Sequence, residues 1–360
     1  MGTLLRYAAL DRLLELGALP NPVLRAGARA GTRLRLRREE RGGVQAQEER
    51  LRALVEHLSS GPVAEHTAAA NEQHYELPSE FLGLFLGPRR KYSGCLWSDG
   101  VHDLAGAEEA MLEATCARAG VRDGMEILDL GCGWGALSLW LAERYPQAKV
   151  LAVSNAHGQR AWIESERDRR GLTGLEVVTA DVNAFAPQRR FDRVISVEMF
   201  EHMRNWAELL RRVAGWLEPD GRAFVHVFAH RRLAYRFEGT WAAERFFTAG
   251  VMPSHDLMLR FQRDLVVAER WAVSGTHYAR TLRAWLARLD AHADEALAVL
   301  RTRHPPRAAK RLLATWRLFL LATAEIWDWR GGDEWLVSHY LLEPRGGSGT
   351  NPLVRRTYSA

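Results

Sequence analysis

The chain has 360 residues, of which 47% are hydrophobic and 26% charged, a balance that allows one large domain or one domain with additions. No apolar run approaches the roughly 20 residues of a membrane span, and acidic residues interrupt the apolar start, so we expect neither membrane insertion nor a secretory signal. The net charge of +5 comes from basic residues that are nearly all arginine and are mixed with acids, so we expect no nucleic-acid partner. The three cysteines form no pattern, which predicts no metal site and favours a cytoplasmic location.

The first part of the chain is expected to be helical. Over residues 1–70, leucines recur at helical spacing between charges, and glycines and prolines interrupt them, which predicts a helical N-terminal extension. Residues 71–122 are expected to connect this extension to the core. The sequence does not decide between a monomer and a homodimer.

Strands and helices alternate over residues 123–230. The predicted strands are 125–131, 148–154, 175–181, 191–198 and 222–230, and the helices between them are 134–146, 158–171 and 205–221. This alternation predicts an α/β fold in which a mainly parallel sheet carries helices on both faces.

The pattern loosens after residue 230. Residues 231–330 are expected to form an insertion rich in Trp, Phe and His, with a long helical stretch over about 278–327. Strands over 264–275 and 334–344 would rejoin the sheet, the second of them within a last segment, 331–345. The tail, 346–360, is expected to be disordered.

The stretch ILDLGCGWG ends a predicted strand with an acid and continues through three glycines into a helix. Glycine adopts positive φ and lets a ligand approach the backbone, at a helix N-terminus that favours polar ligand groups. The spacing of Asp129, Gly131, Gly133 and Gly135 resembles the S-adenosylmethionine turn of Rossmann-like methyltransferases. The implied cofactor is S-adenosylmethionine, with S-adenosylhomocysteine as product.

In such methyltransferases, groups after the second and third strands contact the ribose and the adenine. The resemblance implies that Asp181 meets the adenine, with the Val182 amide beside it. The usual acid after the second strand is absent, so the ribose contacts would fall to Ser154, Asn155 and Gln159.

Four further stretches resemble the superfamily of cyclopropane-fatty-acid synthases and coclaurine N-methyltransferases. They are HYELPSEFLGLFLGPRRKYSGCLW, FEHM, FFTAGVMPS and SGTHYARTLRAWLARLD. The likeness runs from about residue 5 to 345 and implies a class I Rossmann-like methyltransferase with a seven-stranded sheet, a helical N-terminal extension and a helical cap. It implies that 71–122 covers the cofactor, with contacts from Tyr92 and Ser93, and from Val197 after the fourth strand.

The superfamily has two arms that differ in chemistry. The cyclopropane synthases have a small residue where this chain has Glu198, and they hold a bicarbonate-like base with a cysteine, a glutamate, a histidine and a tyrosine. Glu201 and His226 could supply two of these, but the cysteine position falls on Gly94 and the tyrosine position near Leu318. The benzylisoquinoline N-methyltransferases read Glu-x-Phe-Glu-His, as this chain does, so the resemblance favours methylation of an amine nitrogen.

The stretch VEMFEHM fits that chemistry. An alkylammonium must lose a proton before its nitrogen can attack a methyl group, and a carboxylate or imidazole can accept that proton. Glu198, Glu201 and His202 stand at i, i+3 and i+4, so a helical turn would place them on one face of the cofactor cleft, as base and cation holder.

Aromatic residues after the fifth strand are candidates for the substrate pocket, because ring faces attract a cation. The candidates are Phe228, Tyr235, Phe247 and Trp329, together with His226. His226 and His202 could instead be structural histidines, and the tryptophans could be core residues. Methylation of an unsaturated acyl chain, and cofactor binding without turnover, remain the alternative functions.

Overall fold

The computed structural model describes residues 7–65, 77–247 and 250–346. The tail was expected to be disordered, but its residues from 347 onward lie outside the described part of the chain. The same holds for the ends of the expected N-terminal extension, at 1–6 and 66–70, and for residues 71–76 of the expected connector.

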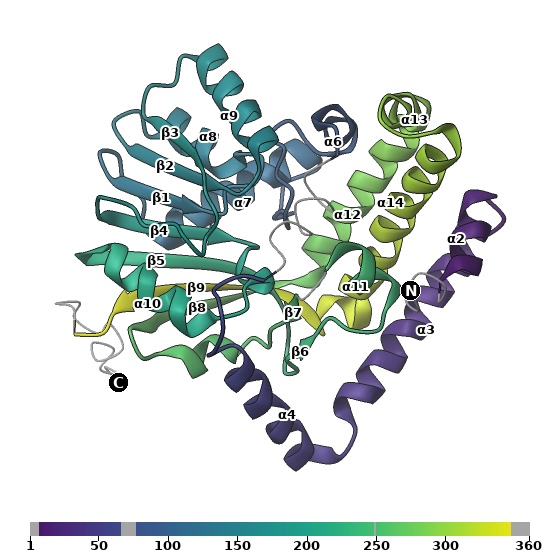
Figure 1. The fold of residues 1–360 in the computed structure, drawn as a ribbon, viewed down its shortest axis with the longest axis horizontal. Coiled ribbons are helices and arrows are strands. Elements are labelled where there is room, and N and C mark those ends of the chain that lie inside the picture. Colours follow the sequence, from purple (N-terminus) through teal and green to yellow (C-terminus); the bar gives the residue numbers. More distant parts are fainter. Residues whose placement is uncertain (1–6, 66–76, 248–249, 347–360) are drawn as a thin grey trace.

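Seven strands form one mixed sheet in the order β3-β2-β1-β4-β5-β9-β8 (Figure 1). The strands are β1 (Glu126–Leu130), β2 (Lys149–Ser154), β3 (Leu175–Thr179), β4 (Phe191–Val197), β5 (Leu217–His230), β8 (Leu265–Ser274) and β9 (Trp335–Pro344). The first five pair in parallel, and β9 lies antiparallel between β5 and β8. This confirms the predicted α/β class and all seven strands.

Both faces of the parallel strands are buried, which explains their continuous apolar runs. On one face, α7 (Leu104–Ala119), α8 (Ala136–Arg144) and α9 (His157–Arg170) cover side chains such as Ile127. On the other, α4 (Gly43–His57) and α10 (Trp206–Trp216) cover side chains such as Leu128.

Three helices form the cap: α12 (Gly275–Ala291), α13 (Ala293–Arg301) and α14 (Pro306–Trp327). The sequence predicted one helical stretch here. The chain instead breaks at His292 and again before Pro306, because two successive prolines cannot continue a helix but can begin one. The short helix α6 (Ser79–Phe85) packs against α12 and α13.

The N-terminal helices lie against the cap although they are far from it in sequence (Figure 1). Both α2 (Ala8–Glu15) and α3 (Asn21–Glu40) pack on α14. The remaining small elements are α11 (Trp241–Phe246), the ribbon β6 (Tyr235–Arg236) with β7 (Val251–Met252), and the 3-10 turns η1 (Phe200–His202), η2 (Leu257–Phe261) and η3 (Trp329–Gly332). The ribbon was not predicted, because two-residue strands carry no alternation.

One predicted boundary is wrong. The helix expected over 205–221 ends at Trp216, and β5 begins at Leu217, which pairs with Phe191 of β4. Pro219 disfavours continuation of the helix. Among the described residues, no helix is both long and apolar enough to cross a membrane.

Candidate active site

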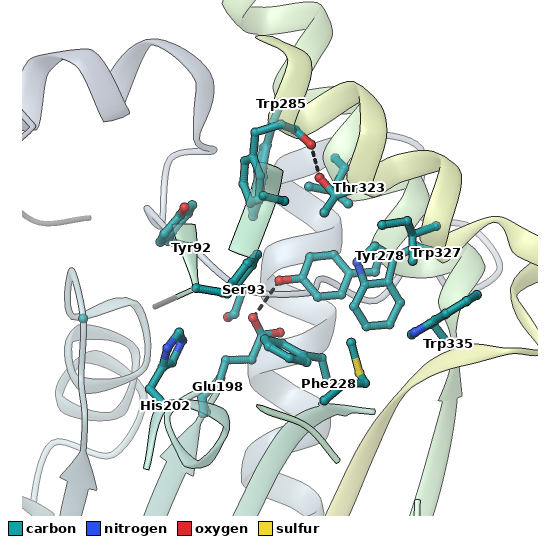
Figure 2. A pocket seen from close by; sticks show the side chains of 18 of the residues that line it. Tyr92, Ser93, Glu198, His202, Phe228, Tyr278, Trp285, Thr323, Trp327 and Trp335 are labelled. Carbon is teal, nitrogen blue, oxygen red and sulfur yellow. Dashed lines mark hydrogen bonds between the residues drawn. The ribbon is translucent and has the colours of Figure 1, made fainter. Parts of the chain in front are cut away.

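A cavity of about 430 Å³ lies where the parallel strands end and the cap begins. The turn after β1, the end of β4 and the loop before α7 line one side, and β5, α12, α14 and α3 line the other. Figure 2 shows Tyr92 and His202 at one end of the view and Trp327 and Trp335 at the opposite end. The cavity is at the carboxyl edge of the sheet, where α/β folds bind ligands.

The glycine turn after β1 has the backbone that the sequence predicts. Gly131, Gly133 and Gly135 all have positive φ, at 84°, 53° and 78°. A Cβ on Gly131 would lie 2.7 Å from Met199 Sδ, and one on Gly135 would lie 2.6 Å from Ile163 Cγ1. A Cβ on Gly133 would meet nothing within 4 Å, and Gly133 lines the cavity. Gly133 is therefore the position where the missing side chain leaves room for a ligand.

Two polar side chains at the expected cofactor end of the cavity, Asp129 and Gln159, are buried. Burial raises the pKa of Asp129 to about 7, although the Ser138 hydroxyl donates to its carboxylate. Gln159 Oε1 accepts from Ser154 Oγ at 2.6 Å, but Gln159 Nε2 is buried without a hydrogen-bond partner. A buried donor left unpaired costs about 1–3 kcal/mol, and a ligand hydroxyl would satisfy it. These groups fit the ribose and methionine parts of S-adenosylmethionine.

The other predicted cofactor residues divide into two groups. Residues that line the cavity are Tyr92, Ser93, Asp129, Gly131, Gly133, Gln159 and Val197. Gly135, Ser154, Asn155, Asp181 and Val182 are not among the lining residues. Ser154 donates to Gln159, which does line the cavity, and Asp181 accepts from the Asn183 amide at 2.8 Å in its own loop.

The loop that carries Tyr92 and Ser93 is tied down by buried charges. Glu108 of α7 accepts from the amides of Arg89 and Lys91, at 2.9 and 3.1 Å. Lys91 Nζ donates to Ser93 Oγ and to the Gly94 carbonyl, and burial lowers the pKa of this lysine. The loop is therefore held against the cavity without help from a ligand.

Glu198 has a constrained backbone and a carboxylate that accepts three hydrogen bonds from the protein. Its φ of 48° is rare for a residue other than glycine, and its amide donates to the His226 carbonyl at 2.8 Å. Oε1 accepts from the Gly94 amide at 2.9 Å and from His226 Nε2 at 3.2 Å, and Oε2 accepts from the Tyr278 hydroxyl at 2.6 Å (Figure 2). Burial raises the pKa of Glu198.

His202 and Glu201 point in different directions. His202 lines the cavity and its ring lies parallel to Phe247, with centroids 6.2 Å apart. Glu201 is fully buried outside the cavity lining, and its Oε1 accepts from the Phe228 amide at 2.6 Å. Burial, and then the neighbouring Glu198, raise the pKa of Glu201 well above its usual range.

The expected single face of Glu198, Glu201 and His202 is therefore not what the structure has. Only 200–202 form a helical turn, of the tighter 3-10 kind, and Glu198 precedes it with positive φ. Glu198 and His202 consequently reach the cavity, while the Glu201 carboxyl group binds the Phe228 amide of β5.

Aromatic side chains form most of the remaining wall. Of the predicted substrate residues, Phe228, Tyr235 and Phe247 line the cavity, whereas His226 and Trp329 do not. The guanidinium of Arg33 lies 5.9 Å from the centroid of the Trp329 ring. His226 reaches the site only through Glu198.

Sequence reasoning missed Tyr278 and Lys91. Tyr278 comes from the first turn of α12, and its ring stacks on Trp327 at 4.4 Å while its hydroxyl reaches Glu198. The resemblance included the stretch around Tyr278, but nothing in its spacing shows which core strand the helix meets. Lys91 is one of three lysines in a chain rich in arginine, which was the available signal.

Comparisons with known proteins show the family to which the chain belongs. Residues 64–329 match the family model of mycolic acid cyclopropane synthetase. The chain is 36% identical to (S)-coclaurine N-methyltransferase of Thalictrum flavum subsp. glaucum over 92% of this chain and 94% of the relative. It is 29% identical to cyclopropane-fatty-acyl-phospholipid synthase of Escherichia coli over 60% of this chain and 55% of that one.

A solved coclaurine N-methyltransferase bound to N-methylheliamine and S-adenosylhomocysteine has a TM-score of 0.89 and 35% identity. The match covers 93% of this chain and 99% of that structure. The glycine turn, the unpaired Gln159 donor and these matches lead to one conclusion. The chain belongs to the mycolic acid cyclopropane synthetase family and is an S-adenosylmethionine-dependent methyltransferase.

Proposed function

We propose that this enzyme methylates the nitrogen of a small amine of the tetrahydroisoquinoline type. The observation that carries the proposal is the Glu198 carboxylate at the wall of an aromatic cavity, where it accepts three hydrogen bonds. A carboxylate in such a setting favours a cationic group, and ring faces add to that preference. The names of the coclaurine N-methyltransferase relatives support the same substrate class.

The chain's own residues have distinct tasks in the proposed reaction. S-adenosylmethionine supplies an electrophilic methyl group. Glu198 holds the substrate as an ammonium ion, and His202 accepts its proton so that the nitrogen lone pair is free to attack. A general base in such a position contributes roughly 10²–10⁴-fold to the rate.

Glu201 is given a supporting task in this proposal. Its carboxyl group is buried away from the cavity, and its raised pKa favours the neutral form. A neutral Glu201 would bind the Phe228 amide and hold β5 against η1. We therefore favour this supporting task over the sequence-based assignment of Glu201 as a base. The two assignments predict different effects of substituting Glu201.

Methylation of an unsaturated acyl chain is the second candidate, because the cavity is largely apolar and one match is a cyclopropane synthase. Against it, the Gly94 amide and His226, which are donors that a free anion would need, already bind Glu198. The amine proposal therefore expects no dependence of the rate on added bicarbonate.

A screen with radiolabelled methyl donor tests the proposal. Tetrahydroisoquinolines and simple amines would be compared with vesicles of unsaturated phospholipid, in degassed buffer with and without bicarbonate. Label in an amine, independent of bicarbonate, is the expected result. Label only in lipid, restored by bicarbonate, would overturn it, and cofactor binding with no labelled product would indicate a binding protein.

A further inference from the structure

A row of side chains crosses the sheet from the cavity to the far side of the molecule. The register pairs Val197 of β4 with His226 of β5, His226 with His339 of β9, and His339 with Trp271 of β8. Arg118, at the end of α7, lies over Trp271 with its guanidinium carbon 5.3 Å from the ring centroid. Glu198 follows Val197, so the row ends at the carboxylate in the cavity.

Hydrogen bonds join this row end to end. Arg118 Nη1 is 2.6 Å from His339 Nδ1, His339 Nε2 is 3.0 Å from His226 Nδ1, and His226 Nε2 is 3.2 Å from Glu198 Oε1. Both histidines are fully buried. Four polar groups aligned in this way through a sheet are costly to bury unless each one is satisfied.

The chemistry of arginine sets the direction of the chain. A guanidinium has donors and no acceptor, so His339 Nδ1 must accept and the ring must carry its proton on Nε2. That proton points at His226 Nδ1, which must then accept, so His226 also carries its proton on Nε2 and donates it to Glu198. Each bond in the row has only one allowed direction.

We propose that Arg118, His339 and His226 form a one-way hydrogen-bond relay that holds Glu198 ionised and oriented toward the substrate. Arg118 and His339 are positioning residues, because neither reaches the cavity. The relay is not a path for protons to leave the site, because Arg118 cannot accept one. The effect on amine binding rests on the proposed function, whereas the tautomers do not.

The surroundings agree with neutral histidines, and Lys91, the Gly94 amide and the Tyr278 hydroxyl favour the ionised form of Glu198 against the effect of burial, which raises its pKa. Burial lowers the pKa of both rings well below the usual value, with Lys91 and Arg118 adding to the effect at each ring. Within the described ranges, no carboxylate forms an ion pair with Arg118, and its guanidinium contacts His339 and the Trp271 ring. The other titratable groups near Glu198 are Lys91, Cys95, Glu201, His202 and Tyr278.

The first test uses ring-nitrogen NMR on the full-length protein without substrate. In the unaltered protein, His226 and His339 should both be neutral with the proton on Nε2. Arg118→Lys keeps a charged donor and should retain this state, whereas Arg118→Met should let His339 exchange between tautomers. A proton on Nδ1 of His339, or a charged His339, at neutral pH in the unaltered protein would overturn the relay.

The second test is kinetic and uses an amine that the screen has identified. Arg118→Met should raise the amine KM on the order of tenfold, because losing Arg118 weakens, through His339 and His226, the hydrogen bond that Glu198 accepts. It should also move the acid limb of kcat/KM to higher pH, since Glu198 loses positive charge that favours its ionised form. Arg118→Lys should restore both, and the affinity for S-adenosylhomocysteine should stay constant.

Arg280→Met is the matched control, since Arg280 also lies over an indole, that of Trp97 at 4.6 Å, and contacts no member of the relay. It should change neither the tautomers nor the pH profile. If Arg118→Met leaves both unchanged as well, the relay is refuted. If no amine is methylated, the proposed function fails, and the NMR experiment still decides the relay.

Discussion

At the scale of single residues, Glu198 combines two unfavourable features with three hydrogen bonds that offset them. Its φ is positive and its side chain is only 9% exposed, while its carboxylate accepts from an amide, a tyrosine and a histidine. Strain of this kind persists where the surrounding structure requires it, and it clusters at active sites. The donors around Glu198 favour the ionised form that burial alone would oppose.

Replacing Glu198 with Gln keeps the shape of the side chain and removes its charge. We expect a 10- to 100-fold higher KM for the amine, on the order of one or two charge-assisted hydrogen bonds, and a smaller change in kcat. Because burial raises the pKa of Glu198, the unaltered enzyme should lose amine affinity on acidification at a higher pH than an ordinary glutamate would require. The variant should lack this acid limb in kcat/KM, and an unchanged limb would contradict the assignment.

His202→Ala tests the base. Turnover should fall by roughly 10²-fold or more while S-adenosylhomocysteine still binds, because proton acceptance is lost and the cofactor end is intact. The variant should recover activity as the pH rises and the amine loses its proton unaided. Normal turnover per folded molecule, with a melting temperature near that of the unaltered protein, would reassign His202 to packing against Phe247.

Substitutions of Glu201 distinguish a catalytic base from a structural carboxyl group. A carboxyl whose pKa is raised on folding stabilises the protein below its ordinary pKa, and this contribution is lost as the pH rises through the raised value. Glu201→Gln stays neutral, so it should match the unaltered enzyme in rate and be the more stable of the two at alkaline pH. Glu201→Ala should lower the melting temperature, because the Phe228 amide loses its partner. A large fall in turnover for well-folded Glu201→Gln would restore Glu201 as a base.

At the scale of elements, the turn from β1 to α8 lines the cavity and is the expected cofactor site. The amides of Gly131 and Cys132 both donate to the Val153 carbonyl of β2, at 3.1 and 2.9 Å, so the turn is anchored to the neighbouring strand. Gly131 and Gly135 are required by the packing of Met199 and Ile163. Gly133 has no such neighbour, and its role concerns the ligand.

Gly133→Val should therefore abolish cofactor binding with modest loss of stability. The added side chain would project into the cavity, and the positive φ of Gly133 would add about 1 kcal/mol or more of strain. Calorimetric titration with S-adenosylhomocysteine, alongside a melting curve, is the measurement. Gly171→Val is a control, since Gly171 also has positive φ and open space but ends α9, away from the cavity lining. Equal affinity in both variants would exclude the turn as the cofactor site.

At the scale of the whole molecule, the N-terminal helix α3 completes one wall of the cavity. Ala28, Gly31, Thr32 and Arg35 of α3 are lining residues, and Arg25 and Arg29 bind Glu325 of α14, whose side chain is only 1% exposed. The wall of the pocket thus depends on contacts between segments about 300 residues apart in the chain.

The double variant Arg25→Met with Arg29→Met should lower the free energy of unfolding by about 2 kcal/mol, because it leaves the Glu325 carboxylate buried and unpaired. It should also raise the amine KM, since α3 would lie less firmly on α14. Glu325→Gln should have the smaller effect on stability, because the two arginines can then turn to solvent. Denaturant unfolding and steady-state kinetics on both variants test this. An unchanged KM would show that the ion pairs of Arg25 and Arg29 with Glu325 do not affect substrate binding.

Local sequence patterns were sufficient for the seven strands of the main sheet and the glycine turn, because apolar runs and glycine spacing encode short-range geometry. The methyltransferase fold followed from the family resemblance. The local patterns also brought Glu198 and His202 to one place, since both follow the same strand. They failed for Glu201, because the direction of its side chain depends on the positive φ of Glu198. They also failed for the groups that come to the cavity from distant parts of the chain. Helix docking brings Tyr278 and α3 to the cavity, and strand register connects His339 and Arg118 to Glu198 through His226. No spacing in the sequence connects these residues. The chain itself therefore determined what chemistry is carried at the end of β4, and the tertiary structure decided which distant groups hold that chemistry in position.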